Sequence, residues 1–275
     1  MKRSAIALIV LASICMFGCA ALNPAPAAPE VAAPEFSNTF TSATGFVARA
    51  VVAGLTAVDP AAWGGWSGAC PGCDVDSSTF FAMCEESGVQ AALFQNASAT
   101  RSNLLRAARA AWADMKPGDL FVFYVSGHGG QDADADGDEE DGVDETICLW
   151  DGPLSDDVLR DLWDEVPAGV RVFMVTDTCH SGTNFKYKPR SLRASIPREF
   201  KGGLIHYGGC ADGSYSYGDA SGGVFTTALV DAWDPGNTYL TWFAAAKKTM
   251  PKNQIPTYAE WGNVDDAFRN ALVFK

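Results

Sequence analysis

The chain has 275 residues, of which 48% are hydrophobic, so it can bury the core of one large domain or two small ones. Its 33 acidic residues outnumber its 20 Lys and Arg residues and give a formal net charge of −13, which argues against nucleic acid as a partner, because phosphate binding needs a concentrated positive surface. The apolar stretch at residues 5–17 is too short to span a bilayer, which excludes a polytopic membrane protein.

The first 44 residues have the composition of a targeting segment followed by a tether. Two basic residues precede the apolar stretch and small residues follow it, so residues 1–18 are predicted to be a secretory signal peptide. Cys19 resembles the lipidation site of bacterial lipoproteins, and residues 19–44 form a Pro- and Ala-rich tether ahead of one domain at residues 45–275. We therefore expect a protein exported to the bacterial cell envelope, periplasmic or on the surface, or secreted, which meets a membrane only through its lipid.

Downstream of residue 45, apolar runs alternate with amphipathic ones, which is the pattern of βαβ units around a buried sheet. The predicted elements, in chain order, are a strand at 46–55, a helix at 77–87, a strand at 89–94, a helix at 101–115 capped by Thr100, a strand at 120–125, a crossover helix at 156–166, strands at 170–175 and 204–208, and helices at 224–233 and 240–250. The strands at 120–125 and 170–175 are almost continuously apolar, which indicates strands covered on both faces. The sequence therefore predicts an α/β fold with a mostly parallel central sheet flanked by helices on both faces.

Two glycine-rich polar segments follow these two apolar strands. Residues 126–130 (SGHGG) come directly after the first, and residues 177–182 (DTCHSG) come directly after the second. In open α/β sheets, ligands and reacting groups collect beyond the carboxyl ends of the strands. If the two strands are neighbours, His128 and Cys179 face each other across a cleft.

A Cys and a His within reach of one another suit nucleophilic acyl chemistry. The thiolate attacks a carbonyl, and the imidazolium holds the thiolate and later protonates the leaving amine. The backbone N–H groups of Gly129 and Cys179 are candidates for the oxyanion hole. Alternatively, Cys179 is a buried strand-end cysteine and His128 a turn histidine, but their joint position at two strand exits weakens this interpretation. His180 is expected to be structural and His206 to lie in the core.

Three motifs occur in a fixed order: YVSGHGG, then the acidic DGDEEDGVDE, then DTCHSGT. Together they resemble the caspase-like cysteine peptidases, specifically the type I metacaspases and their bacterial metacaspase-like relatives, the orthocaspases. The similarity extends from residue 45 to about residue 262. It implies a caspase-like fold, with His128 and Cys179 as the catalytic dyad of an endopeptidase that cleaves after Arg or Lys. The pentapeptide around the cysteine of true caspases, Gln-Ala-Cys-x-Gly, is absent, so aspartate specificity is not implied.

The resemblance also implies a substrate pocket for a basic side chain. Asp177 matches one pocket acid, and Asp76 matches the second, with Cys73 and Ser126 beside it. A guanidinium in a cleft needs one or two carboxylates to replace its hydration. On the residues alone, Asp76 is as well explained as a helix N-cap ahead of Ser77, and Asp177 as a surface turn residue.

Residues 132–145 hold nine carboxylates, a density that usually indicates a solvated, disordered loop. In the metacaspase family the activating calcium ion is held by acids that match Asp144, Asp156 and Asp157, whereas a further acid expected after the cysteine falls near Lys186. We therefore expect Ca²⁺ as an activating cofactor that neutralises the acidic segment and orders the cleft.

The predicted function is a cysteine endopeptidase, acting as a monomer on proteins or peptides with Arg or Lys before the cut. The basic segment at residues 186–201 is either a solvated loop or a site of self-cleavage. The first alternative is a catalytically inactive, calcium-binding surface lipoprotein with the same fold. The second is a thiol redox protein that uses Cys70 and Cys73, which have CxxC spacing. A disulfide is open to any pair among Cys70, Cys73, Cys84, Cys148 and Cys210.

Overall fold

The structure is a computed structural model that describes residues 30–36, 45–134, 142–185 and 200–275. The predicted signal peptide at residues 1–18 and the predicted lipid site at Cys19 lie outside the described residues. The same is true of residues 186–199, so self-cleavage in the basic segment stays a prediction. Within the described part of the chain, no helix is long and apolar enough to cross a membrane.

A six-stranded sheet forms the centre of the fold, with the strand order β11-β8-β7-β3-β1-β2. Five of the strands run parallel, and β11 pairs antiparallel with β8 at one edge. The strands are β1 (Ala48–Gly54), β2 (Gln90–Gln95), β3 (Leu120–Ser126), β7 (Arg171–Asp177), β8 (Gly203–Gly208) and β11 (Thr257–Gly262). The predicted α/β fold with a mostly parallel sheet is confirmed, whereas the edge strand β11 was not predicted.

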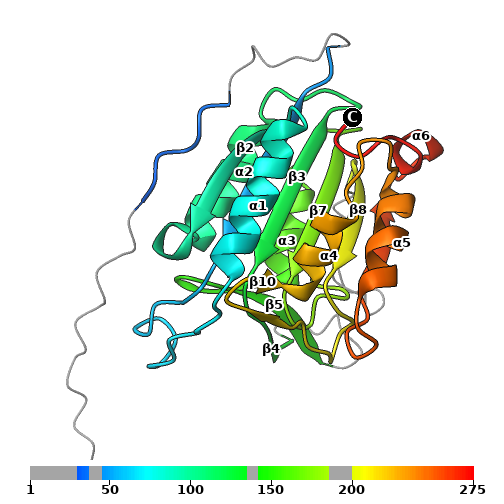
Figure 1. Cartoon of the computed structure of the whole chain (residues 1–275). Coiled ribbons are helices and arrows are strands. Elements are labelled where there is room, and N and C mark those ends of the chain that lie inside the picture. Colours follow the sequence, from blue (N-terminus) through cyan, green and yellow to red (C-terminus); the bar gives the residue numbers. More distant parts are fainter. Residues whose placement is uncertain (1–29, 37–44, 135–141, 186–199) are drawn as a thin grey trace, which may run out of the picture.

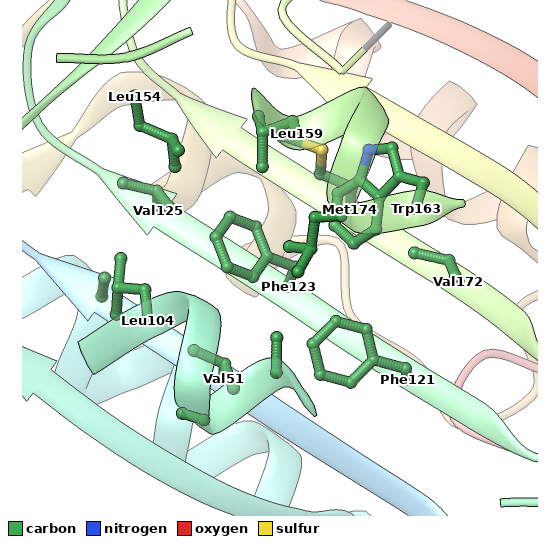
Figure 2. Packing of buried hydrophobic residues seen from close by; sticks show 14 of the residues in the cluster. Val51, Leu104, Phe121, Phe123, Val125, Leu154, Leu159, Trp163, Val172 and Met174 are labelled. Carbon is green, nitrogen blue, oxygen red and sulfur yellow. The ribbon is translucent and has the colours of Figure 1, made fainter. Parts of the chain in front are cut away.

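Helices cover both faces of this sheet, because its strands are apolar on both sides (Figure 1). The helices are α1 (Cys73–Glu86), α2 (Arg101–Trp112), α3 (Asp156–Trp163), α4 (Val224–Asp231), α5 (Tyr239–Thr249) and α6 (Asp266–Arg269), with a short 3-10 turn η1 (Asn96–Ser98). Successive strand residues face opposite layers: Phe123 packs with α2 and α3, and Tyr124 packs with α1, α4 and α5. Figure 2 shows the first layer, in which Phe121, Phe123 and Trp163 fill the space between sheet and helices.

A second, antiparallel sheet lies beyond the carboxyl end of β3 and consists of β4 (Gly129–Ala133), β5 (Val143–Leu149) and β6 (Gly152–Ser155). Figure 1 shows it at the end of the central sheet opposite α6. A short antiparallel ribbon of β9 (Gly218–Asp219) and β10 (Gly222–Gly223) precedes α4. The acidic segment therefore enters the fold at both ends, with residues 135–141 outside the described residues. The prediction of a solvated loop is wrong for Asp144 and Glu145, which are buried because the apolar side of β5 packs into the core.

The helix boundaries depend on local caps. Thr100 caps α2 as predicted, since its side chain accepts a hydrogen bond from the N–H of Asn103. Helix α1 begins earlier than predicted, at Cys73, because Gly72 adopts a left-handed conformation with φ of 96° directly before it. Asp76 therefore lies within the first turn of α1, and its interpretation as the N-cap is wrong.

Candidate active site

The pairing of β3 with β7 places His128 and Cys179 at the same edge of the central sheet. Ser126 and Asp177 are partners in the parallel register, and the two residues of interest each lie two positions beyond them. The Gly127 N–H donates to the Asp177 carbonyl at 3.3 Å, so the two chain segments stay in contact after the strands end. The imidazole and the thiol thus lie on neighbouring segments at one rim, which is the arrangement that the sequence required.

Gly129 brings the backbone of the histidine segment directly against that of the cysteine segment. A Cβ atom built on Gly129 would lie 1.9 Å from the carbonyl oxygen of Cys179, so no larger residue fits without a shift of the backbone. The carbonyl of His128 accepts a hydrogen bond of 3.0 Å from the N–H of Cys148 on β5, which fixes the segment from its other side. The backbone positions proposed for the oxyanion hole, Gly129 and Cys179, are therefore adjacent.

The His128 ring is oriented by the loop between β1 and α1. Its Nε2 lies 3.2 Å from the carbonyl oxygen of Ala69. Because a carbonyl oxygen only accepts, Nε2 carries the hydrogen, which leaves Nδ1 of the neutral ring as the proton acceptor. Trp66, which is 43% exposed, lies against the ring with a centroid separation of 5.0 Å.

Cys179 is half-buried, with its thiol 3.9 Å from the carbonyl oxygen of Ser216. Burial raises the pKa of the Cys179 thiol, and the negative charges of Cys70 and Asp177 act in the same direction. The neutral thiol is therefore the resting form, and a nearby base must remove its proton before it can attack. The adjacent imidazole supplies such a base.

Two buried carboxylates lie beside the dyad, on the residues predicted to bind a basic side chain. Asp177 ends β7 and is 5% exposed, whereas Asp76 is 3% exposed and projects from α1. Ser126 Oγ donates to Asp76 Oδ2 at 2.7 Å, and Cys73, the first residue of α1, is buried next to them. The structure thus brings the four predicted pocket residues together, and Asp177 is not a surface turn residue.

Hydrogen bonds from uncharged groups hold both carboxylates. Asp76 accepts from the N–H of Gly223 at 2.8 Å, and Asp177 accepts from Ser216 Oγ at 2.5 Å and from the N–H and Oγ1 of Thr226 at 2.9 and 2.8 Å. Burial and the neighbouring Asp177 raise the pKa of Asp76 to about 6, and burial raises the pKa of Asp177. Both carboxyl groups therefore take up a proton more readily than usual unless a cation lies beside them.

No Lys, Arg or His among the described residues forms an ion pair with either carboxylate. Gly223 lies between them, since a Cβ there would be 2.3 Å from Asp177 Oδ2 and 3.0 Å from Asp76 Oδ2. Buried carboxylates without a cationic partner are costly, and such sites are found where a charged ligand supplies the partner.

Sequence reasoning missed the residues that hold these acids: Ser216, Gly223, Thr226 and Gln254. Gln254 is 2% exposed and donates from Nε2 to Ser216 Oγ at 2.7 Å and to the Gly209 carbonyl at 3.0 Å, while its Oε1 accepts from the N–H of Tyr217 at 3.1 Å. Gln254 therefore fixes the segment around Ser216, whose carbonyl oxygen lies near the Cys179 thiol and whose hydroxyl donates to Asp177. Only the Gly222–Gly223 pair ahead of α4 was visible in the sequence as a sign of close backbone approach.

The carboxylates expected to hold calcium lie on β5 and at the start of α3. Strands β5 and β6 run antiparallel, with Thr146 opposite Ser155. Asp144, which precedes Thr146, and Asp156 and Asp157, which follow Ser155, therefore lie at the same end of the two strands. The Arg160 guanidinium contacts Asp157 at 2.8 Å, and Asp156 Oδ1 accepts from the N–H of Asp157 at 3.0 Å. The described residues contain no group of three or more His, Cys, Asp or Glu side chains placed to hold a metal ion, and calcium binding stays a prediction.

The two remaining histidines lie where the sequence placed them. His206 on β8 is fully buried and hydrogen bonded to Thr176 Oγ1 at 2.8 Å, and burial lowers its pKa to about 3. His180 follows Cys179 and has a positive φ of 51°, and its backbone N–H donates to the Ser214 carbonyl. The six cysteines of the described residues are free thiols: Cys70, Cys73, Cys84, Cys148, Cys179 and Cys210.

Comparison with known proteins identifies similar sequences and folds. The family profile "Metacaspase, peptidase C14 domain" matches residues 76–188, a range that includes Asp76, His128, Asp177 and Cys179. Metacaspase-1 of Yarrowia lipolytica is 37% identical over 139 residues, 46% of this chain and 29% of its own length, and Metacaspase-1 of Schizosaccharomyces pombe is 36% identical over 141 residues, 47% of this chain and 32% of its own. The chain thus matches less than a third of the length of these relatives.

Two solved structures share the fold. Protein GSU0716 from Geobacter sulfurreducens superposes with a TM-score of 0.73 at 32% identity, covering 83% of this chain and 98% of that one. Caspase-1 from Spodoptera frugiperda superposes with a TM-score of 0.55 at 16% identity, covering 79% of this chain and 86% of that one, which is a likeness of fold alone.

The curated relatives correct the expected location. They are metacaspases of fungi, including Yarrowia lipolytica, Schizosaccharomyces pombe and Neurospora crassa, rather than lipoproteins of bacteria. The prediction of an exported protein of the bacterial cell envelope is therefore wrong. It rested on the composition of residues 1–44, namely the basic and apolar residues 1–18, Cys19 and the Pro- and Ala-rich residues that follow.

Proposed function

Because the chain belongs to the caspase-like, metacaspase-type family of peptidase C14 domains, we propose that it is a cysteine endopeptidase that hydrolyses proteins after Arg or Lys. One observation carries the specificity. Two buried carboxylates, Asp76 and Asp177, lie beside the Cys–His pair with hydrogen-bond donors around them and no cation from the described residues. A guanidinium or ammonium group of the substrate completes this site, because it replaces the missing positive charge.

The geometry of the dyad supports an acyl-transfer mechanism. His128 Nδ1 takes the proton of the Cys179 thiol as the sulfur attacks the carbonyl carbon of the scissile bond. The oxygen of the tetrahedral intermediate lies near the backbone N–H groups of Gly129 and Cys179, which stabilise its negative charge. The imidazolium then protonates the leaving amine, a thioester remains on Cys179, and a water activated by His128 hydrolyses it and restores the thiol.

The Ala69 carbonyl contributes to this mechanism by fixing the ring. Its hydrogen bond with Nε2 selects the tautomer with Nδ1 unprotonated and stabilises the imidazolium after proton transfer. The raised pKa of the thiol makes the base necessary, since little thiolate is present beforehand.

The test uses the full chain with fluorogenic peptides that are identical except for Arg, Lys, Gln or Asp before the cut. We expect cleavage of the Arg and Lys peptides and a loss of about 1,000-fold or more in kcat with Cys179→Ala, as for other essential nucleophiles. Cys84→Ala is the matched control, because Cys84 is buried in α1 within the core and makes no contact with the dyad.

Three results would overturn the proposal. They are retention of activity by Cys179→Ala, equal cleavage of the Gln and Arg peptides, and no cleavage of any peptide by folded protein with or without calcium. Calcium stimulation stays a prediction separate from this mechanism, since no step above requires a metal ion.

A further inference from the structure

The loop that leads into α1 carries a second pair of thiols. Cys70 lies three residues before Cys73, and their Sγ atoms are 2.8 Å apart. A disulfide bond is about 2.05 Å long, so oxidation of this pair needs a movement of less than about 1 Å. We propose that Cys70 and Cys73 form a redox-active dithiol that closes to a disulfide, and that this modification weakens binding in the pocket beside it.

The backbone holds the two cysteines in this arrangement. The N–H of Cys70 donates to the Thr56 carbonyl at 2.9 Å, and the N–H of Cys73 points back to the Cys70 carbonyl at 3.5 Å. Between them, Gly72 takes the left-handed conformation that lets the chain turn into the helix, and a Cβ there would lie 2.0 Å from the Asp219 carbonyl oxygen. The close approach of the sulfurs is therefore a consequence of a tightly constrained turn.

The environment gives the two thiols different roles. The hydrogen bond from the Cys73 thiol lowers the pKa of Cys70, while the same bond and burial raise the pKa of Cys73. The positive end of the α1 dipole also favours a thiolate at this position. Cys70 is half-exposed and Cys73 is buried, so Cys70 is the thiol that meets an oxidant and Cys73 the one that completes the bond.

A low-molecular-weight disulfide such as glutathione disulfide is a sufficient oxidant. The Cys70 thiolate attacks one sulfur, which forms a mixed disulfide and releases one glutathione thiolate. Cys73 then attacks the Cys70 sulfur and releases the second glutathione. The dithiol loses two electrons and two protons, which end on the two glutathione thiols, and a dithiol reductant reverses the exchange.

The dithiol is connected to the predicted pocket through Cys73. The Cys73 sulfur lies beside the hydroxyl of Ser126, which lowers the pKa of Cys73, and Ser126 Oγ donates to Asp76 Oδ2 at 2.7 Å. In the disulfide, the Cys73 sulfur is drawn toward Cys70 and away from Ser126, which disturbs the hydrogen bond from Ser126 to Asp76. We expect about a fivefold rise in KM for the Arg peptide, the effect of one lost hydrogen bond, with little change in kcat. This second half of the inference rests on the proposed function, whereas disulfide formation does not.

The experiment equilibrates the full chain in buffers of reduced and oxidised glutathione, traps free thiols by alkylation, and measures the intact mass and the alkylated peptides. We expect the wild type to lose the mass of two hydrogens, with Cys70 and Cys73 protected from alkylation and both recovered after dithiothreitol. In Cys70→Ala the protection of Cys73 and the rise in KM both disappear, while activity under reducing conditions is retained. Cys84→Ala is the matched control and behaves as the wild type; the unfolding temperature of each variant establishes that it is folded.

The outcomes separate this inference from the peptidase proposal. If both Cys70 and Cys73 are still alkylated at a concentration of oxidised glutathione that already modifies Cys179, the dithiol proposal is overturned, even where the reduced enzyme is fully active. A reversible Cys70–Cys73 disulfide that leaves KM unchanged would overturn its link to the pocket. A reversible disulfide in a chain that cleaves no peptide would overturn the peptidase proposal and leave the dithiol in place, because the mass measurement needs no turnover.

Discussion

The protein balances the charges of two groups of carboxylates in different ways. Beside the predicted dyad, Asp76 and Asp177 accept hydrogen bonds from hydroxyl and backbone N–H groups. Neither carboxylate forms an ion pair with another described residue. At the start of α3, Asp157 is paired with the guanidinium of Arg160 at 2.8 Å. In the first cluster the described residues supply no cation, whereas in the second the chain supplies one of its own.

The difference follows from what hydrogen bonds can and cannot do. Neutral donors replace part of the lost hydration of a carboxylate, but they do not cancel its charge. The pKa of Asp76, raised to about 6 by burial and by Asp177, shows that the pocket still disfavours two negative charges. A substrate cation relieves this repulsion, so we expect the pocket to depend on charge far more than the α3 cluster does.

The largest expected effect comes from removing one pocket charge without changing its shape. Asp177→Asn should lower kcat/KM for the Arg peptide about 30-fold or more, since loss of one partner of a buried charge pair costs about 2–5 kcal/mol. The Gln peptide should lose much less, because it carries no charge to pair. The measurement is the ratio of the two kcat/KM values.

Glu86→Gln is the matched control for this substitution, because Glu86 is an exposed carboxylate at the end of α1. It should leave the Arg to Gln ratio unchanged. If Asp177→Asn keeps the wild-type ratio, the buried acid has no role in recognising the substrate cation, and the proposed difference between the pocket and the α3 cluster is wrong.

A smaller effect is expected at Asp76, because a carboxyl with a pKa of about 6 is already partly protonated near neutral pH. As the pH falls through 6, Asp76 gains a proton and the pocket loses one negative charge, so selectivity for Arg over Gln should fall about tenfold. The ratio cancels the ionisation of the dyad, which affects both peptides. Asp76→Asn should start at the lower selectivity and show no step near pH 6; a step that persists in this variant belongs to another group.

The sequence predicts the central sheet and the dyad for one physical reason. Strands buried on both faces must be apolar throughout, so the runs at 120–125 and 170–175 stand out, and the polar residues that follow mark the strand ends. The equal register of Ser126 and Asp177 could not be predicted, because it depends on the pairing of β3 with β7. That register decides whether His128 and Cys179 meet.

The supporting residues of the pocket were invisible for a related reason. Ser216, Thr226 and Gln254 come from segments far along the chain, and a single serine, threonine or glutamine has no periodicity that marks it. The charged strands β4 and β5 were misjudged because acidic runs favour loops, while tertiary pairing overrides this preference. The predicted start of α1 is too late because Asp76 was considered as a capping residue, although acids also favour the first turn within a helix.

The smallest expected effect concerns calcium at the α3 cluster. A calcium ion that bound Asp157 would compete with Arg160, so Arg160→Gln should lower the calcium concentration for half-maximal stimulation about fivefold, since such an ion pair contributes up to about 1 kcal/mol. Arg109→Gln, which removes an ion pair with Glu165 elsewhere on the surface, is the matched control and should leave the calcium response unchanged. Peptidase assays over a calcium titration, with chelator as the zero point and calorimetry as an independent measure of binding, provide the readout. If the wild type and Arg160→Gln respond identically to calcium, or if neither responds, calcium does not bind at Asp157. The charge of this carboxylate is then balanced by Arg160 alone, unlike the charges of the pocket carboxylates.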